Sequence, residues 1–551
     1  MAMVLLSMSA AGNRTIAEWV VEFLVDRGVD RVYGHRGSHV QPIWDELAKR
    51  DVQIVHARRE SAAVHMAHCH GVLTGRPGVV LVNAESGVTD CVTAIVNARV
   101  QRVPIFLIGA CAPVPKHDTA PPQGIDCVAI MEPATRAAGT FHAGDSLLGE
   151  LDKFWSLAVG EGTAPGPAYA EFPANVLRRR IPAELALHGY VNQRPPLRIV
   201  PDTAEISRAA ALIAAAHRPV VVTGRGALTA SAELLNFLQS AGAVYLQTQE
   251  TVGLVSEAHP SNATAARSLV EREADLVIVV GCRVDYHIGG DATATFRNAR
   301  LISIADNAEE LTGKRRCDVE LFASPALALG ALARALPECR LLDVGWTAAV
   351  HHEHVHCSEK HLKALALAPK GRDGHMHPYQ IFAALNDVLD ADAIKIADGG
   401  ELLGAARLGF ESARCYVDPG AIGCVGVATP YAIAAALLEP ERQVVAISDD
   451  QAFGVSAPEI GTAKDCGARA LFVVASHAAQ SVEAVERQQN RGEGGRIDGA
   501  SLRSRTLGWS RAFRVHVERV TDTERLRPAF KEALSRLPSL VEVIVTSHAV
   551  P

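Results

Sequence analysis

Two adjacent carboxyl groups and a histidine follow the ends of two predicted strands in the segment 442–477. Asp449 and Asp450 come after the run RQVVAIS, and His477 ends the run ALFVVASH, 27 residues after Asp450. Because the carboxyl ends of neighbouring parallel strands meet at one edge of a sheet, where such sheets bind ligands, Asp450 and His477 can hold one cation together. A pair of aspartates is also a common helix N-cap, so a structural role stays open.

Another carboxyl group, Glu60, lies in the run HARRESAAVHMAHCHG, after the predicted strand VQIVHA and at the start of a helix of small residues. A carboxylate in the first turn of a helix stabilises it by interacting with the positive end of the helix dipole. The position at a strand end also suits ligand binding, and the small residues allow a ring to approach closely. Both roles are compatible with the sequence.

Positioning these side chains requires a scaffold of alternating strands and helices. Short β-branched runs separated by helical stretches predict α/β domains with doubly wound parallel sheets over 12–185, 200–345 and 377–551. Between the second and third domains, we expect a linker over 346–376. It contains the histidine-rich tract HHEHVHCSEKH at 351–361, whose ligand spacing is irregular, which favours a solvated linker over a metal site.

The composition describes an ordinary globular protein. The chain has 551 residues, of which 48% are hydrophobic, and its net charge of -7 offers no electrostatic footprint for nucleic acid. Its 11 Cys form no CxxC pair, which is typical of reduced thiols. The N-terminal run MAMVLLSMSAAG fits neither an export signal nor a membrane span. We therefore expect a cytoplasmic protein that acts on a small molecule, without nucleic-acid or membrane partners.

Several stretches together resemble one enzyme family. They include VYGHRGSHVQPIWDEL, the RRESAA element that carries Glu60, ADLVIVVGCR, HPYQIF and VVAISDDQAF, and they extend in order from about residue 12 to the C-terminus. The chain resembles the thiamine-diphosphate enzymes of the acetolactate synthase and pyruvate decarboxylase type, most closely benzaldehyde lyase. This resemblance implies a pyrimidine-binding, a central and a diphosphate-binding domain. It also implies thiamine diphosphate, a divalent metal (Mg2+ or Mn2+), and a homodimer or homotetramer with active sites between subunits.

The resemblance assigns roles to individual residues. Glu60 is similar to the carboxyl group that bonds the pyrimidine ring of the cofactor and drives its imino tautomer, which places it in a cleft between subunits. His39, in GHRGSH, matches the histidine that benzaldehyde lyase uses for proton transfer at the substrate hydroxyl. Val425 falls where a bulky apolar residue props the cofactor into its bent shape.

The diphosphate motif departs from the family pattern. Where relatives have GDG, this chain has Asp449-Asp450-Gln451, and Ser476-His477 replaces their NN. The resemblance makes Asp450 and Gln451 cofactor-binding, and Asp450, His477 and the main-chain carbonyl of Ala479 metal ligands. The loss of both glycines restricts close approach of a phosphate. Asp449 adds a negative charge that opposes it, and an imidazole suits Mn, Zn, Co or Ni better than Mg.

Three functions stay open at this point. The first is a thiamine-diphosphate-dependent carbon-carbon lyase or carboligase acting on 2-hydroxyketones or aldehydes, which Glu60 and His39 favour. The second is the same fold with cofactor binding lost or altered, doing other chemistry or acting as a non-catalytic scaffold, which the changed diphosphate motif favours. The third is an enzyme like the 2-oxo acid decarboxylases or acetolactate synthases, because Arg36 near His39 can accept a substrate carboxylate.

Overall fold

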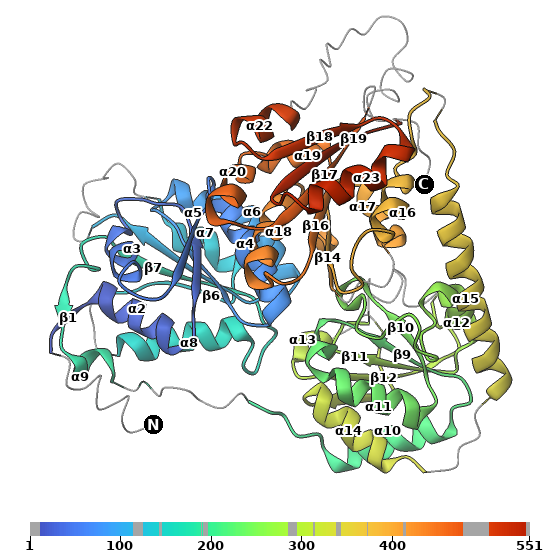
Figure 1. Cartoon of the computed structure of the whole chain (residues 1–551). Coiled ribbons are helices and arrows are strands. Elements are labelled where there is room, and N and C mark those ends of the chain that lie inside the picture. Colours follow the sequence, from blue (N-terminus) through green and yellow to red (C-terminus); the bar gives the residue numbers. More distant parts are fainter. Residues whose placement is uncertain are drawn as a thin grey trace, which may run out of the picture.

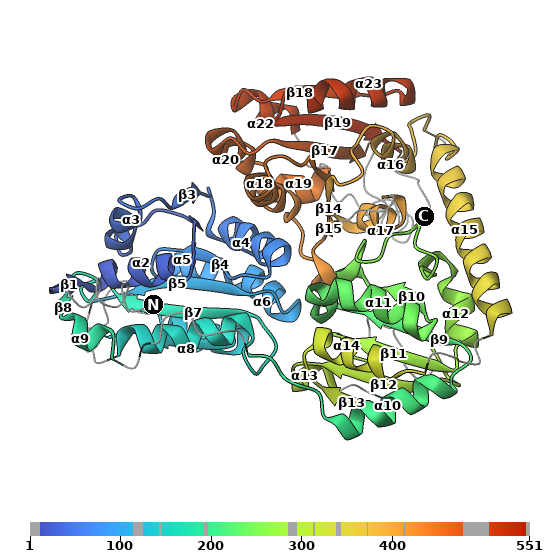
Figure 2. The same ribbon diagram turned by 60° about the horizontal axis from the view of Figure 1, so that its bottom comes forward.

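The computed structural model of the chain contains three α/β domains (Figures 1 and 2). It describes residues 12–113, 125–142, 146–188, 190, 197–284, 295–311, 315–337, 343–371, 373–410, 415–477 and 506–546. Each domain has a parallel sheet flanked by helices, so the predicted fold class is confirmed. Within these residues, no helix has both the length and the apolar character needed to cross a bilayer.

The first domain has a six-stranded sheet in the order β3-β2-β4-β5-β7-β6. Two hydrophobic clusters lie on opposite faces of this sheet, which accounts for strands such as β5 that are buried along their whole length. The elements are β1 (Arg14–Thr15), α2 (Ile16–Asp26), β2 (Arg31–Gly34), α3 (Gln41–Leu47), β3 (Gln53–His56), α4 (Glu60–Thr74), β4 (Gly78–Leu81), α5 (Ser86–Asp90), α6 (Val92–Val100), β5 (Ile105–Cys111), α7 (Cys127–Met131), η2 (Glu132–Ala134), β6 (Ala137–Thr140), α8 (Leu147–Val159), β7 (Pro167–Pro173), β8 (Arg180–Ile181) and α9 (Ala183–Ala186).

The central domain has a five-stranded parallel sheet in the order β10-β9-β11-β12-β13. Valine-rich and isoleucine-rich strands form its core, and helices cover both faces. The elements are α10 (Thr203–Ala215), β9 (Pro219–Thr223), η3 (Arg225–Ala230), α11 (Ser231–Ala241), β10 (Val244–Gln247), η4 (Gln249–Thr251), η5 (Thr264–Ala266), α12 (Arg267–Glu273), β11 (Leu276–Val280), β12 (Arg300–Ala305), α13 (Ala308–Leu311), β13 (Val319–Phe322) and α14 (Pro325–Ala335).

The third domain repeats the topology of the first. Its sheet has the order β15-β14-β16-β17-β19-β18, so both six-stranded sheets follow the same path when the strands are counted within each domain. The elements are α16 (Tyr379–Asn386), β14 (Ile394–Ala397), α17 (Gly400–Gly409), β15 (Cys415–Val417), η7 (Gly420–Ile422), α18 (Ala428–Leu438), β16 (Val444–Asp449), α19 (Asp450–Ser456), α20 (Glu459–Cys466), β17 (Ala470–His477), α22 (Thr506–Ala512), β18 (His516–Val520), α23 (Thr523–Leu534) and β19 (Ser539–Val545).

Most of the stretch expected as a linker, 346–376, belongs to a long helix. α15 (Val344–Ala366) begins at the N-cap Asp343, whose side chain accepts the N–H of Trp346 at 3.0 Å, and runs from the central domain towards the third (Figure 1). His354 is buried against the central domain, where its Nδ1 accepts the N–H of Ala265 at 3.1 Å. The histidine-rich tract is therefore part of a helix, and the side of this helix that carries His354 packs against the central domain.

The first and third domains share one hydrophobic core. α4 and α18 lie side by side, and the residues of both helices belong to a single buried cluster. Both helices are buried on nearly every side, which is expected for helices enclosed between two sheets. Asn97 donates to the hydroxyl of Tyr431 at 3.4 Å across this contact.

An ion pair holds the first domain to the central domain. The guanidinium of Arg102 is 9% exposed and donates to both oxygens of Glu250, at 3.0 and 2.8 Å, and also to Glu310. Burial raises the pKa of Glu310 to about 6, although the nearby Arg102 acts in the opposite direction. Removing the guanidinium would leave the buried Glu310 without its cation and Glu250 with Arg225 alone.

Candidate active site

The predicted site residues gather at corresponding places in two sheets. In the first domain, β2 and β4 are neighbours at the point where the strand order reverses, and β14 and β16 are their counterparts in the third domain. Such a switch point opens a crevice beyond the carboxyl ends of the strands, where α/β sheets bind ligands. His39 follows β2, whereas Asp449 and Asp450 follow the body of β16. Both groups thus lie where the topology favours a ligand.

Glu60 is the first residue of α4 and is partly buried. Its Oε1 lies 3.1 Å from the point where a Cβ on Gly87 would stand, and Asn83 also lies close to that point. The carboxyl group therefore points towards the segment after β4 rather than into bulk solvent. The structure brings Glu60 to the same edge of the sheet as His39.

Asn83, which the sequence analysis missed, orients His39. Its Oδ1 accepts the main-chain N–H of His39 at 3.2 Å and lies 3.2 Å from the ring Nδ1. The main-chain group can only donate, so this atom is the amide oxygen, and Nδ1 must carry a hydrogen to bond it. In the neutral ring, the lone pair is then on Nε2. A Cβ on Gly37 would stand 2.2 Å from Cγ of Asn83, so the loop needs glycine to wrap this closely.

A carboxyl group of the third domain holds the loop before Glu60. Oε1 of Glu459, at the start of α20, accepts the main-chain N–H of Arg58 at 2.9 Å and that of Arg59 at 3.2 Å. Its Oε2 accepts the hydroxyl of Thr462 at 2.7 Å, and the side chain is buried. No local pattern signals this contact, because its partners are main-chain groups about 400 residues away in the sequence.

Another buried acid, Asp398, lies in the third domain directly after β14 and is fully buried. Its carboxylate accepts the N–H groups of Gly399, Val427 and Ala428 at 2.7, 2.6 and 3.1 Å. Burial raises the pKa of Asp398 to about 6, and the charge of Asp449 acts in the same direction. These bonds hold the segment before α18, on which Val425 is 52% exposed.

A small pocket lies between the first and third domains, next to the start of α4. It is lined on one side by the first two turns of α4, including Ser61 and His65, and on the other by Val425, Gly426 and Val455. Val425 and the helix that begins with Glu60 thus lie on opposite walls of one hollow. Glu60 itself does not line this pocket, and its place in a cleft between subunits stays a prediction.

Asp449 caps α19, as the sequence allowed. Its Oδ1 accepts the N–H of Ala452 at 2.7 Å. Its Oδ2 reaches across to the start of α17, 2.4 Å from where a Cβ on Gly399 would stand. Gly399 has φ +88°, so only glycine fits this position without strain and without colliding with the carboxylate.

The predicted metal ligands are only partly within the described residues. β16 and β17 are hydrogen-bonded neighbours, with Asp449 opposite Ala475, so Asp450 and His477 come from adjacent strand ends. The side chain of His477 and all of Ala479 lie outside the described residues, and the shared cation stays a prediction. Gln451 is exposed in the first turn of α19. Among the residues that the structure describes, no three His, Cys, Asp or Glu side chains are grouped to hold a metal ion.

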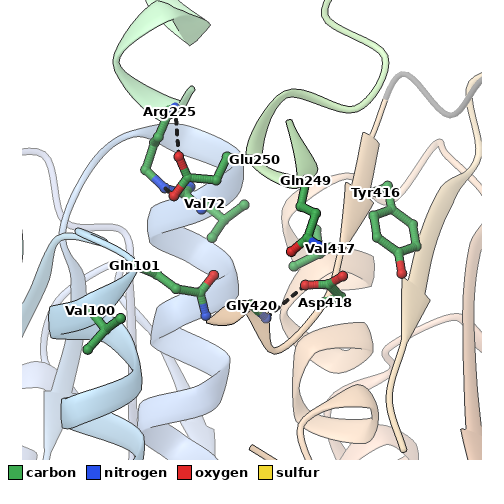
Figure 3. A pocket seen from close by; sticks show the side chains of 10 residues that line it. All are labelled: Val72, Val100, Gln101, Arg225, Gln249, Glu250, Tyr416, Val417, Asp418 and Gly420. Atoms are coloured by element: carbon green, nitrogen blue, oxygen red, sulfur yellow. Dashed lines mark hydrogen bonds and ion pairs between the residues drawn. The ribbon is translucent and has the colours of Figure 1, made fainter. Parts of the chain in front are cut away.

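A second small pocket lies where all three domains meet (Figure 3). The predicted site residues do not line it. Arg225 on one side pairs with Glu250, whose Oε2 accepts the main-chain N–H of Arg225 at 3.0 Å, and Asp418 on the other accepts the N–H of Gly420 at 2.8 Å. Gln101 of the first domain spans the wall by donating to the carbonyl of Pro419 at 2.8 Å. The bond from Gln101 to Pro419 ties the first domain to the third.

Family comparisons match each domain separately. Residues 14–130 match the N-terminal TPP binding domain of thiamine pyrophosphate enzymes, 206–332 match the central domain, and 398–543 match the C-terminal TPP binding domain. The three matches occur in the family's order and together span most of the chain. The chain belongs to the thiamine pyrophosphate enzymes. Thiamine pyrophosphate is another name for thiamine diphosphate, so the family resemblance expected from the sequence is confirmed.

Curated relatives of this thiamine pyrophosphate enzyme cover nearly its whole length. It is similar to the acetolactate synthase large subunit IlvG of Mycobacterium tuberculosis, with 27% identity over 94% of this chain and 93% of that protein. It is 26% identical to the oxalyl-CoA decarboxylase of Escherichia coli, over 96% and 94% of the two chains. It is 25% identical to the 2-hydroxyacyl-CoA lyase of Saccharomyces cerevisiae, over 84% and 83%. These relatives catalyse different reactions, so they indicate an enzyme without selecting its substrate.

Membership in the family implies thiamine diphosphate as cofactor and a divalent metal as its typical companion. The residues present fit this cofactor unevenly. Glu60 at a helix start, beside the small Gly87, suits a flat heteroaromatic ring. The third-domain edge does not suit a diphosphate as it stands, because the Asp449 carboxylate lies against the start of α17. The two halves of the site therefore differ in how well they keep the family's chemistry.

Proposed function

We propose that this thiamine pyrophosphate enzyme is a carbon-carbon lyase or carboligase acting on 2-hydroxyketones or aldehydes. The observation that carries the proposal is the tautomer of His39, set by Asn83, at the sheet edge that also holds Glu60. Cleavage of a 2-hydroxy carbonyl compound requires a base for the hydroxyl proton, and the reverse reaction requires an acid. The names of the 2-hydroxyacyl-CoA lyase relatives support this class of reaction.

The proposed roles follow from the positions of the residues. Nε2 of His39 takes the proton from the substrate hydroxyl as the carbon-carbon bond breaks, and returns it when two aldehydes are joined. Imidazole suits this task because its usual pKa lies close to neutral pH. Glu60 binds the ring of the cofactor, and Val425 props the cofactor into its bent shape. Asp450, Gln451 and His477, with the carbonyl of Ala479, are proposed to bind the diphosphate and a divalent ion, Mg2+ or Mn2+.

Two other functions each have an observation in their favour. The Asp449 carboxylate at the start of α17 favours a protein whose cofactor binding is altered or lost. The acetolactate synthase and oxalyl-CoA decarboxylase relatives favour a reaction that releases carbon dioxide. Arg36 is the candidate partner for a substrate carboxylate in that case, although its Nε donates to His56 at 3.1 Å here.

We further propose a cytoplasmic homodimer or homotetramer whose active sites combine two subunits. Light scattering at micromolar concentration tests the assembly, because a monomer would contradict it. Fractionation of the native cells tests the location.

The reaction is tested by measuring cleavage of benzoin, acetoin and a 2-hydroxyacyl-CoA with thiamine diphosphate and either Mg2+ or Mn2+. We expect His39→Ala to lower the rate about 10² to 10⁴-fold without abolishing cofactor binding. Glu60→Gln should remove activity, whereas His352→Ala, on the exposed side of α15, serves as the matched control and should have no effect. Carbon dioxide release from a 2-oxo acid, with no cleavage of any hydroxy carbonyl compound, would favour the decarboxylase instead.

A further inference from the structure

Two helices begin next to each other at the switch point of the third domain. α17 starts at Gly400 directly after β14, and α19 starts at Asp450 after β16, which is the hydrogen-bonded neighbour of β14. The N-terminus of a helix presents free N–H groups and a partial positive charge, which together favour an anion. An anion at this point can therefore interact with the start of α17.

An anion of the chain already occupies that point. The carboxylate of Asp449 joins the two helix starts, because Oδ1 accepts the N–H of Ala452 in α19 while Oδ2 lies against Gly399 at the start of α17. Oδ2 is 2.4 Å from the Cβ position of Gly399 and 3.9 Å from that of Gly400. A phosphate oxygen cannot take this place while the carboxylate remains there.

We propose that Asp449 is an internal competitor for the diphosphate of the cofactor, so that this single side chain sets the affinity of the site for thiamine diphosphate. The inference rests on the family's cofactor and is independent of the lyase reaction proposed above. To admit the diphosphate, the side chain must rotate away from Gly399 or give up its bond to Ala452. In either position, its charge remains close to the phosphates.

The cost can be expressed as a change in affinity. Two like charges about 5 Å apart, at an effective dielectric constant near 20, repel enough to weaken binding on the order of a hundredfold. Removing the charge alone, as in Asp449→Asn, should recover most of this loss of affinity. Removing the whole side chain, as in Asp449→Gly, should also free the space that the carboxylate fills. Asn keeps an oxygen that can cap α19, and Gly is itself a tolerated N-cap, so both variants should fold.

The test is calorimetric titration of the full-length protein, with Mg2+ and then Mn2+ in excess, using thiamine diphosphate and unphosphorylated thiamine as the two ligands. We expect Asp449→Gly to bind thiamine diphosphate on the order of a hundredfold more tightly than the wild type, and Asp449→Asn to show an intermediate gain. Thiamine, which has no phosphate, should bind all three proteins equally. Asp202→Asn, which changes a comparable N-cap in the central domain, should behave as the wild type.

Several results would overturn the inference. A change of less than threefold in both variants would show that Asp449 only caps α19. Equal gains for thiamine and thiamine diphosphate would mean that the substitutions alter the ring pocket and not the diphosphate position. Failure of Asp449→Gly to bind thiamine diphosphate at all would show that something else excludes it. A clear gain in binding without any cleavage activity would support the inference and reject the lyase.

Discussion

Replacing Glu459 with Ala should loosen the contact between the first and third domains at the site. Its carboxylate accepts hydrogen bonds from the main chain of Arg58 and Arg59 and from Thr462. A hydrogen bond to a charged group contributes about 1.5 to 3 kcal/mol. Arg58 and Arg59 are exposed, so water can replace part of what is lost, and we expect a total cost of about 2 to 4 kcal/mol.

The assay is native-state hydrogen exchange, because a chain of three domains need not unfold in one step. The measured quantity is the exchange rate of the peptide that joins β3 to α4. A cost of about 2 to 4 kcal/mol corresponds to exchange roughly 30-fold to 1,000-fold faster in Glu459→Ala. Glu459→Gln keeps an acceptor for the two N–H groups and should accelerate exchange by about tenfold or less. Glu441→Ala, at an exposed acid of the same domain, is the control.

Acceleration of less than threefold in Glu459→Ala would refute this reasoning. It would mean that the packing of α4 on α18 holds the loop before Glu60 without help from the carboxylate. Acceleration of the same size throughout the third domain would also contradict it, because the effect would then be general destabilisation and not the loss of one contact.

Three other changes test the structure. Arg102→Ala should destabilise the protein by about 3 to 5 kcal/mol, because the buried Glu310 loses its cation and Glu250 keeps only Arg225. A melting temperature close to that of the wild type would exclude this. Burial lowers the pKa of His65 to about 4 and that of His68 well below 6.5. These two histidines bind more protons in the unfolded chain, so their own contribution to stability should be complete above pH 6.5 and be lost towards pH 4. Glu310 and Asp398, whose pKa values are raised, act in the opposite direction, so the test compares His65→Ala with the wild type. The same pH dependence of the melting temperature in both proteins would contradict the prediction. Gly399→Ala should lower the free energy of unfolding by about 1 to 3 kcal/mol, through backbone strain and contact with Asp449. In chemical denaturation, the double variant with Asp449→Gly should be more stable than the sum of the two single changes predicts, by more than about 0.5 kcal/mol. Additive changes in stability would show that the two residues do not touch.

The fold could be predicted because its signals are local. A buried parallel strand must be a short β-branched run and a covering helix must be apolar over several turns, so the alternation of strands and helices is visible in single stretches of sequence. The positions of Glu60, Asp449 and Asp450 at strand ends follow from the same pattern. The sequence did not predict that most of 346–376 is a helix. The few residues that α15 buries are scattered among many polar residues, so they give no clear helical pattern.

The sequence by itself determined the three α/β domains, the family and the residue types at the strand ends. Only the tertiary structure decided what those residues touch: His39 meets Asn83, Glu459 holds the loop before Glu60, and Asp449 lies against Gly399. These partners are separated by about 40 to 400 residues. The periodicity of a sequence shows which face of a helix or strand is buried. These contacts depend instead on the distance and angle at which whole elements pack against each other, and a single sequence carries no local signal of either.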